Sequence, residues 1–289
     1  MKKLILSSVF ILLISFYAVS QTTGSKHNSL FDSSIDQTKS NVQNEFDNNS
    51  AKKQTQSKAL VPLQPDISFD EFPVNHNMHI ATDGSFYYTI NGGNFSIGQI
   101  NKFDLSGNLI QTYPIQIDGR GLSYNKADGF LYASLYAKSI VRIDNLATGA
   151  FTTIFTNAMQ NDQASFAISN DGTKYYDFYM GTLLIHDFFT GTVINTINGL
   201  SYGAGNFGGD AAVAVDSLYI FTWDATIKTV SKYDFTGNLM QTLVLDSGEN
   251  GHSISRAGNY LFVAHDGNYA TGRWYGDRKS TRLNSSHRT

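Results

Sequence analysis

A turn made of an aspartate and a Ser-Gly or Thr-Gly pair recurs along this chain at a nearly fixed interval. The clearest copies read Phe-Asp-Leu-Ser-Gly-Asn-Leu-Ile-Gln-Thr at 103–112 and Tyr-Asp-Phe-Thr-Gly-Asn-Leu-Met-Gln-Thr at 233–242. The glycines of the four copies are Gly107, Gly149, Gly191 and Gly237, at intervals of 42, 42 and 46 residues. A fixed period of this size indicates a repeat architecture.

A second turn keeps the same period. An Asp-Gly or Asp-Ser pair stands shortly before an aromatic or aliphatic run, with its aspartate at Asp83, Asp128, Asp171 and Asp216, which are 45, 43 and 45 residues apart. A fifth copy reads Gly-Asn before Tyr260. Two turns that stay in phase are much harder to obtain by chance than one.

The segments between these turns are short and rich in Tyr, Phe, Ile, Val and Thr, which is typical of β-strands bounded by turn residues. Asp offers a side-chain acceptor to the turn backbone, and Gly adopts the left-handed conformation of a tight hairpin. We therefore interpret each repeated aspartate as a structural residue. Four antiparallel strands in each unit of about 40–45 residues predict the blade of a β-propeller.

Over about residues 78–276 the chain resembles the broad class of secreted bacterial propellers built from YVTN-, NHL- or WD40-like blades. The expected fold class is an all-β propeller of four-stranded antiparallel blades. The pattern departs from true WD40 repeats, because the Trp223-Asp224 pair follows a second strand and does not end a blade. A β-sandwich or jelly roll is the alternative all-β fold, but neither predicts this period.

The blade count predicts a protein that continues beyond the repeats seen. Residues 79–276 hold about four and a half units, and 67–72 could supply the outer strand that closes the ring. Residues 277–287 resemble an in-frame translation of a short-read sequencing adapter at all eleven positions. We therefore expect an artefactual tail at 277–289, an incomplete propeller at 66–276, and six or seven blades in the natural protein.

The N-terminal segment predicts export. Residues 1–20 have two lysines, an apolar stretch and a small-residue cleavage site, as in a signal peptide, and the apolar stretch is short for the alternative, a membrane anchor. Residues 21–65 are polar and predict a disordered linker. The chain resembles exported proteins of Bacteroidota, and we expect a secreted, cell-surface or periplasmic location with no transmembrane span after cleavage.

Charge and composition narrow the expected chemistry. The formal net charge is −3, and it is −6 without the tail, which carries four cations and Asp277. A mildly acidic protein has no surplus of cations for phosphates, so we expect no nucleic-acid partner. The chain has no cysteine, which excludes thiol catalysis. The sequence contains no Gly-x-Ser-x-Gly or His-Glu-x-x-His motif, no phosphate loop and no EF-hand pattern. No catalytic residue is therefore predicted.

The start of each innermost strand is the expected place for a site, because it faces the central channel of a propeller. Aligning the units at their turns gives six axial-channel candidates. They are His79, Arg120, Asp162, Asp210, Glu249 and His252. Carboxylates and imidazoles that converge on one cavity can hold a divalent metal such as Ca²⁺. The alternative is that strand ends at a wet channel mouth are polar in any case.

Two main functions remain open from the sequence. The first is an exported, non-catalytic propeller that binds protein or glycan through loops on one face. The alternative is a metal-dependent hydrolase or lyase, which the resemblance to lactonase-like propellers implies, with a metal near Asp210, His252 and Arg120. A weaker third hypothesis is a quinone- or haem-linked electron-transfer subunit.

Overall fold

The computed structural model describes residues 65–71, 76–93, 98–203, 212–244, 251–266 and 270–278. All of them belong to one compact unit, Ala59–Thr289. Every regular element in this described part is a β-strand, and the strands form five antiparallel sheets of four. Among the same residues there is no helix long and apolar enough to cross a membrane.

Each sheet is one blade, and its strands follow one another from the centre outward. Blade 1 contains β2 (His76–Thr82), β3 (Tyr87–Gly92), β4 (Gln99–Phe103) and β5 (Leu109–Pro114). Blade 2 contains β6 (Gly119–Asn125), β7 (Phe130–Leu135), β8 (Ile140–Asn145) and β9 (Ala150–Phe155). Blade 3 contains β10 (Ser165–Ile168), β11 (Lys174–Tyr179), β12 (Thr182–Asp187) and β13 (Val193–Ile197). Blade 4 contains β14 (Val213–Val215), β15 (Ile220–Asp224), β16 (Thr229–Tyr233) and β17 (Leu239–Val244). Blade 5 contains β18 (Gly251–Ala257), β19 (Tyr260–His265), β20 (Gly272–Asp277) and β1 (Ile67–Glu71).

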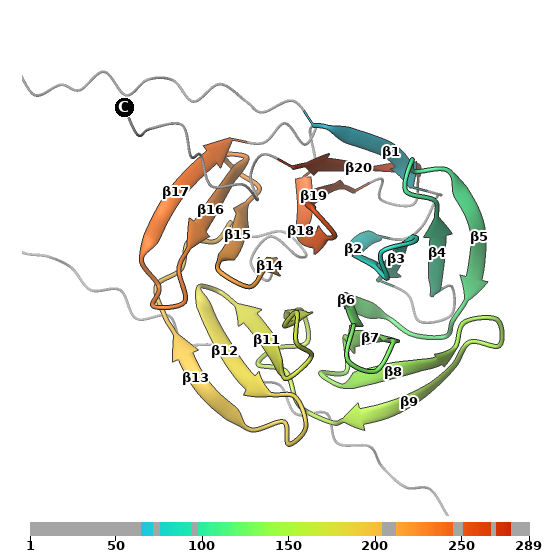
Figure 1. Ribbon diagram of the computed structural model, residues 1–289, viewed down its shortest axis with the longest axis horizontal. Helices are drawn as coiled ribbons and strands as arrows, with labels where there is room; N and C mark the ends of the chain where they lie inside the picture. The colour runs from blue at the N-terminus through green and yellow to red at the C-terminus, as the bar shows by residue number, and fades with distance from the viewer. Residues whose placement is uncertain are drawn as a thin grey trace, which may run out of the picture. The chain divides into compact units, whose positions relative to one another are not determined.

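The five blades form a closed ring. Each innermost strand contacts the innermost strand of the next blade, and β18 contacts β2. In Figure 1, β14 and β18 lie near the centre, while β5, β9, β13 and β17 lie at the rim. This confirms the predicted all-β propeller of four-stranded blades. The described residues form five blades, and nothing in the structure supports the expected six or seven.

Blade 5 is completed by a strand from the other end of the chain. β1 pairs antiparallel with β20, with Phe69 opposite Trp274 and Glu71 opposite Gly272. The prediction that this segment supplies the closing outer strand is confirmed for Ile67–Glu71, and residue 72 lies outside the described residues. β20 runs one residue into the adapter-like segment, since Asp277 pairs with Leu261 and is buried.

Aromatic side chains fill the junction between blade 5 and blade 1. Phe69, Tyr87, Phe103 and Phe262 are all buried there. The ring centroids of Phe69 and Phe103 are 5.0 Å apart, and those of Tyr87 and Phe262 are 5.2 Å apart. Contacts at this distance add attraction to the burial of apolar area. The closing blade is thus held to blade 1 by a packed core as well as by strand pairing.

One buried carboxylate also joins these two blades. Glu71 is 2% exposed, and its Oε1 accepts a 2.7 Å hydrogen bond from Asn101 Nδ2 in blade 1. Its Oε2 accepts a 2.8 Å bond from Trp274 Nε1 in blade 5. Buried charges are stable in proteins when they are hydrogen-bonded in this way. Glu71 therefore fixes β1 against both of its neighbours.

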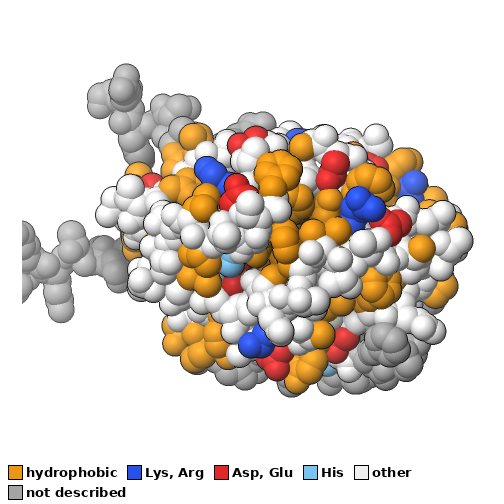
Figure 2. Space-filling model, turned by 90° about the horizontal axis from the view of Figure 1, so that it is seen from below, with side chains coloured by type: hydrophobic (Ala, Val, Ile, Leu, Met, Phe, Trp, Pro, Cys, Tyr) orange, Lys and Arg blue, Asp and Glu red, His pale blue; other side chains and the backbone are white. Residues whose placement is uncertain are grey.

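The outer strands carry a mixed surface. Three of them begin with two exposed apolar residues directly after the turn, and these side chains are 42–57% exposed. The pairs are Leu109 with Ile110, Val193 with Ile194, and Leu239 with Met240. Figure 2 views one side of the molecule, where acidic and basic side chains are scattered, some of them next to one another, among apolar and other side chains. No continuous stripe of one charge is visible on that side.

We expect Glu71→Ala to lower the free energy of unfolding by about 3 kcal/mol, because it leaves two buried donors without a partner. Asp70→Ala is the matched control, since Asp70 is 63% exposed on the same strand and pairs with Arg273 at the surface. Exposed ion pairs contribute about 0–1 kcal/mol. Urea denaturation of both variants measures the difference, and equal losses would contradict the role given to Glu71.

Candidate functional site

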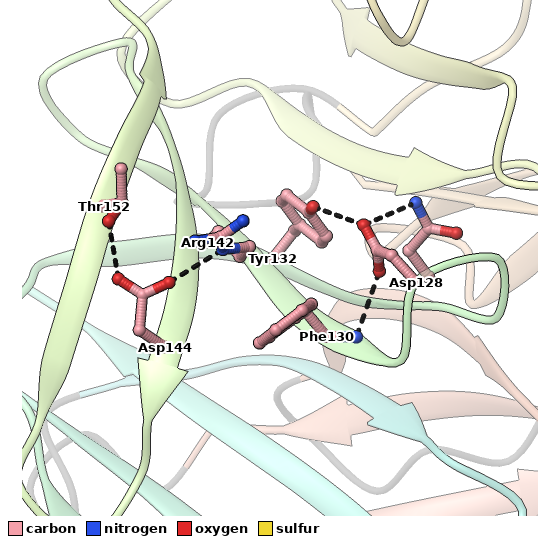
Figure 3. A network of polar contacts seen from close by, with 7 residues as sticks. Asp128, Phe130, Tyr132, Arg142, Asp144 and Thr152 are labelled. Carbon is pink, nitrogen blue, oxygen red and sulfur yellow. Dashed lines mark hydrogen bonds and ion pairs between the residues drawn. The ribbon is translucent and has the colours of Figure 1, made fainter.

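The carboxylates of the repeated aspartates accept hydrogen bonds from residues of their own hairpins. Asp128 accepts a 3.1 Å bond from the Phe130 amide and a 2.6 Å bond from the Tyr132 hydroxyl. Asp144 accepts bonds from Arg142 Nε at 2.7 Å and from the Thr152 hydroxyl at 2.5 Å. Figure 3 shows both networks, in which each carboxylate faces donors of its own blade.

The turns between the third and fourth strands follow the same rule. Asp234 Oδ1 accepts bonds from the amides of Thr236 and Asn238 at 2.9 and 3.0 Å. The hydrogen bond from the Thr236 hydroxyl, together with these amide bonds and that from the Asn238 side chain, lowers the pKa of Asp234 to about 2. Gly237 lies between them with φ +87°, a conformation that favours glycine. The interpretation of the repeated aspartates as structural residues is confirmed.

A cavity of about 190 Å³ opens where the innermost strands end. All five blades contribute to its lining, which includes His79 from β2, Ser123 from β6, Ile168 from β10, Val215 from β14 and Arg256 from β18. We call this cavity the axial pocket. The turns that follow the innermost strands surround it, and we call this side of the ring the turn face. These turns are 83–86, 126–129, 169–173, 216–219 and 258–259.

Polar groups join neighbouring blades along the wall of the axial pocket. His79 Nδ1 lies 2.7 Å from the Leu122 carbonyl of blade 2. The amide of Ile80 donates to Ser255 Oγ of blade 5, and the amide of Ile168 donates to Ser123 Oγ of blade 2. Inner strands of adjacent blades belong to different sheets, so these side chains supply the partners that a sheet would otherwise provide.

His79 is neutral at neutral pH. Burial lowers the pKa of its imidazole to about 4, and the carbonyls of Leu122 and Val213 offset only part of that shift. Nδ1 therefore carries the proton that it donates to Leu122. Nε2 makes no hydrogen bond to a described residue, although the Val213 carbonyl lies near the ring. His79 is thus a structural link between blades 1 and 2.

The charged groups of the axial pocket are cations. Lys126 and Arg256 line it, and neither makes a hydrogen bond or ion pair with a residue that the structure describes. Arg256 is half-buried, and its Nε is fully buried without a partner. The described lining includes no carboxylate. The pocket is therefore positive and rich in free donors.

A second cavity of about 400 Å³ opens on the turn face between blades 3 and 4. We call it the inter-blade groove. Tyr176 and Phe235 lie in its wall with ring centroids 5.8 Å apart, and Lys174 lies at its edge. Asn170 lines both this groove and the axial pocket, and its side chain has no partner among the described residues. Asn170 therefore belongs to the lining of both cavities.

Arg120 and Asp162 lie apart from the axial pocket, near the start of the innermost strands. Arg120 is the second residue of β6 and pairs with Asp118 at 2.9 Å, with Tyr136 stacked on its guanidinium at 5.0 Å. Burial lowers the pKa of Arg120, while Asp118, Tyr136 and Asp162 act in the opposite direction. This end of the channel contains a closed ion pair.

The structure thus separates the six axial-channel candidates. His79 lies in the wall of the axial pocket, whereas Arg120 and Asp162 lie near the strand starts. Asp210, Glu249 and the side chain of His252 lie outside the described residues. Among the residues that are described, no group of three or more His, Asp or Glu could hold a metal ion.

Alignment of the strand starts missed the residues at the opposite strand ends. Lys126 and Asn170 lie within the first turns of their blades, and Arg256 lies two residues before its turn, so the turn signal already accounts for the local backbone there. The signal available in the sequence was a polar or charged side chain in or close to the first turn of a blade.

The comparisons with known proteins identify the fold and assign no family. No protein-family model matches the chain, and no curated protein matches it. Among solved structures, a tail fibre of Staphylococcus aureus phage P68 is similar with a TM-score of 0.51 and 16% identity, over 78% of this chain and 57% of that chain. The fold is a β-propeller. Identities this low show the fold alone.

Two further structures have lower scores. Glutaminyl cyclase of Myxococcus xanthus gives a TM-score of 0.49 and 10% identity over 74% of this chain and 97% of that chain. Apo AztD from Citrobacter koseri gives 0.34 and 14% over 59% of this chain. The match spans 47% of AztD, about half of its length.

We expect the wild-type protein to lose more stability between pH 7.5 and pH 4.5 than His79→Asn does. The pKa of His79 is about 4 when folded and 6.5 in the reference state, so the unfolded chain takes up the proton first. The stabilisation is complete above about pH 6.5 and is lost as the pH falls toward 4, by roughly 2–3 kcal/mol at pH 4.5. Denaturant titrations at the two pH values measure it. Equal losses in both proteins would contradict a buried, neutral His79.

Proposed function

We propose that this protein is an exported, non-catalytic propeller that binds a glycan through its turn face. The proposal rests on one observation: Asn170 lines both the axial pocket and the inter-blade groove. Export is proposed from residues 1–20, which have the composition of a signal peptide.

The chemistry of the two cavities supports a saccharide over a peptide or an apolar ligand. Sugars present many hydroxyl groups together with apolar ring faces, so they need free polar partners and aromatic surfaces in one place. The axial pocket offers Lys126, Arg256 and the Asn170 amide without partners among the described residues. The inter-blade groove offers the partly buried ring of Phe235, which packs against the buried Tyr176. Small sites with a few placed polar groups are typical of small-ligand recognition.

The non-catalytic part of the proposal rests on how the acidic side chains are used. Asp171 and Asp216 line the inter-blade groove and Asp83 adjoins the lining of the axial pocket, and all three carboxylates accept hydrogen bonds within their own turns. Those bonds lower the pKa of Asp171 to about 2, which leaves a weak base that does not act as a proton donor at neutral pH. General acid or base work needs a pKa near the working pH.

We expect Phe235→Ala to weaken glycan binding about tenfold or more, because it removes an aromatic wall of the inter-blade groove. Phe189→Ala is the matched control, since Phe189 occupies the corresponding turn of blade 3, is 73% exposed and does not line the groove. Binding of the purified protein to an array of neutral and acidic polysaccharides, followed by titration of the best ligand, measures both variants. Absence of binding to any saccharide, or equal loss in the two variants, would contradict the proposal.

A further inference from the structure

We infer that the axial pocket binds the carboxylate-bearing sugar at the end of an acidic saccharide, with Arg256 as the group that receives the carboxylate. This inference rests on the glycan-binding function proposed above and names the class of glycan. The remainder of the saccharide lies along the inter-blade groove past Asn170.

The unpaired guanidinium of Arg256 is the first reason. Arg256 comes from the innermost strand β18, is half-buried, and has a fully buried Nε with no partner among the described residues. Removing a charged donor from water is costly unless an acceptor replaces the water. A carboxylate matches the planar fork of a guanidinium with two parallel hydrogen bonds. A bound carboxylate therefore supplies what Arg256 lacks in the free protein.

The surroundings of Arg256 favour an anion from outside. Lys126 adds a second positive charge to the same lining. Asp83 is committed to the amides of Ser85 and Phe86 and to the Tyr88 hydroxyl. Asp171, in the wall of the inter-blade groove, accepts hydrogen bonds from Ser169 and Thr173. Both carboxylates are therefore hydrogen-bonded within their own turns, and the described lining of the axial pocket contains no carboxylate to neutralise its cations.

The size of the axial pocket limits how much of the ligand enters. Its volume of about 190 Å³ corresponds to roughly six water molecules, at ~30 Å³ each. This is room for one sugar ring with its carboxylate and excludes a folded peptide loop. The lining also includes Tyr124, Ser123 and Asn170, which suit ring stacking and hydroxyl groups.

The inter-blade groove continues the path for the following sugars. It is about twice as large as the axial pocket, at about 400 Å³, and its wall is more apolar. Tyr176 and Phe235 form its aromatic side, and Asn195 and Ser217 lie in the same lining. A chain that leaves the axial pocket past Asn170 meets these rings next. The two cavities thus predict the direction in which the saccharide binds, with its acidic sugar in the axial pocket and the following sugars in the inter-blade groove.

The test uses isothermal titration of the whole protein with a glucuronic acid-terminated trisaccharide, the glucose-terminated equivalent, and an equivalent sulfated at the terminal sugar. We expect the carboxylated trisaccharide to bind at least tenfold more tightly than the neutral one, with an affinity that falls as salt rises. Arg256→Gln is expected to bring the carboxylated ligand close to the neutral one. Arg142→Gln is the control, because Arg142 is a half-buried arginine outside both cavities that pairs with Asp144 within blade 2.

The outcomes separate the inference from the proposed function. Equal binding of the three trisaccharides, unchanged by Arg256→Gln, would overturn the anionic axial site and leave glycan binding intact. Preference for the sulfated ligand would overturn the assignment of a carboxylate. No binding to any saccharide would overturn the proposed function itself. If Arg256→Gln fails to fold, the ratio of carboxylated to neutral affinity in the wild-type protein and its salt dependence decide the inference.

Discussion

The pairing of β1 with β20 is the constraint on which the rest of this structure depends. It joins residues about 200 positions apart into one sheet and places Glu71 between Asn101 and Trp274. Ordering so long a loop is entropically costly, although the cost grows only slowly with loop length. The aromatic core around Phe69 and the buried carboxylate provide the compensating interactions. Without them, blade 5 would lack its outer strand.

Closure also shapes the axial pocket. His79 and Arg256 come from β2 and β18, the innermost strands on either side of the closing junction, and both line the pocket. The amide of Ile80 donates to Ser255 across the same junction. The distance between blade 1 and blade 5 at the axis therefore follows from the contact that closes the ring. The proposed ligand site is a product of closure, since no single blade contains it.

The sequence predicted most of the fold because its strongest signals are local. Aspartate, glycine and aromatic residues at fixed spacing dictate hairpins, and Gly107, Gly191 and Gly237 adopt the positive φ that those hairpins need. The site was harder to predict, because it depends on which strand ends meet at the axis. Arg256 and Asn170 lie 86 positions apart, in or near turns whose other residues already account for the backbone. The number of blades could not be predicted from local sequence signals either, because it depends on the curvature of the whole ring.

The charged residues of this protein fall into two groups, those with partners inside their own blade and those without a described partner. Asp128, Asp144 and Asp234 are satisfied within their own hairpins, so they hold the backbone and leave little free acidity at the turn face. Arg120 is neutralised by Asp118 at the other end of the channel. Arg256 and Lys126 have no such described partner. This contrast is the basis for assigning ligand binding to the turn face.

Cross-linking of β1 to β20 tests the central claim most directly. The chain has no cysteine, so the double substitution Asp70→Cys and Arg273→Cys introduces one possible disulfide, between two residues that face each other across the strand pair. Adjacent antiparallel strands hold such pairs within disulfide range. We expect rapid, nearly complete cross-linking under mild oxidation, with a higher unfolding temperature and retained secondary structure. Failure of the two cysteines to join in the folded protein would contradict a ring closed by β1.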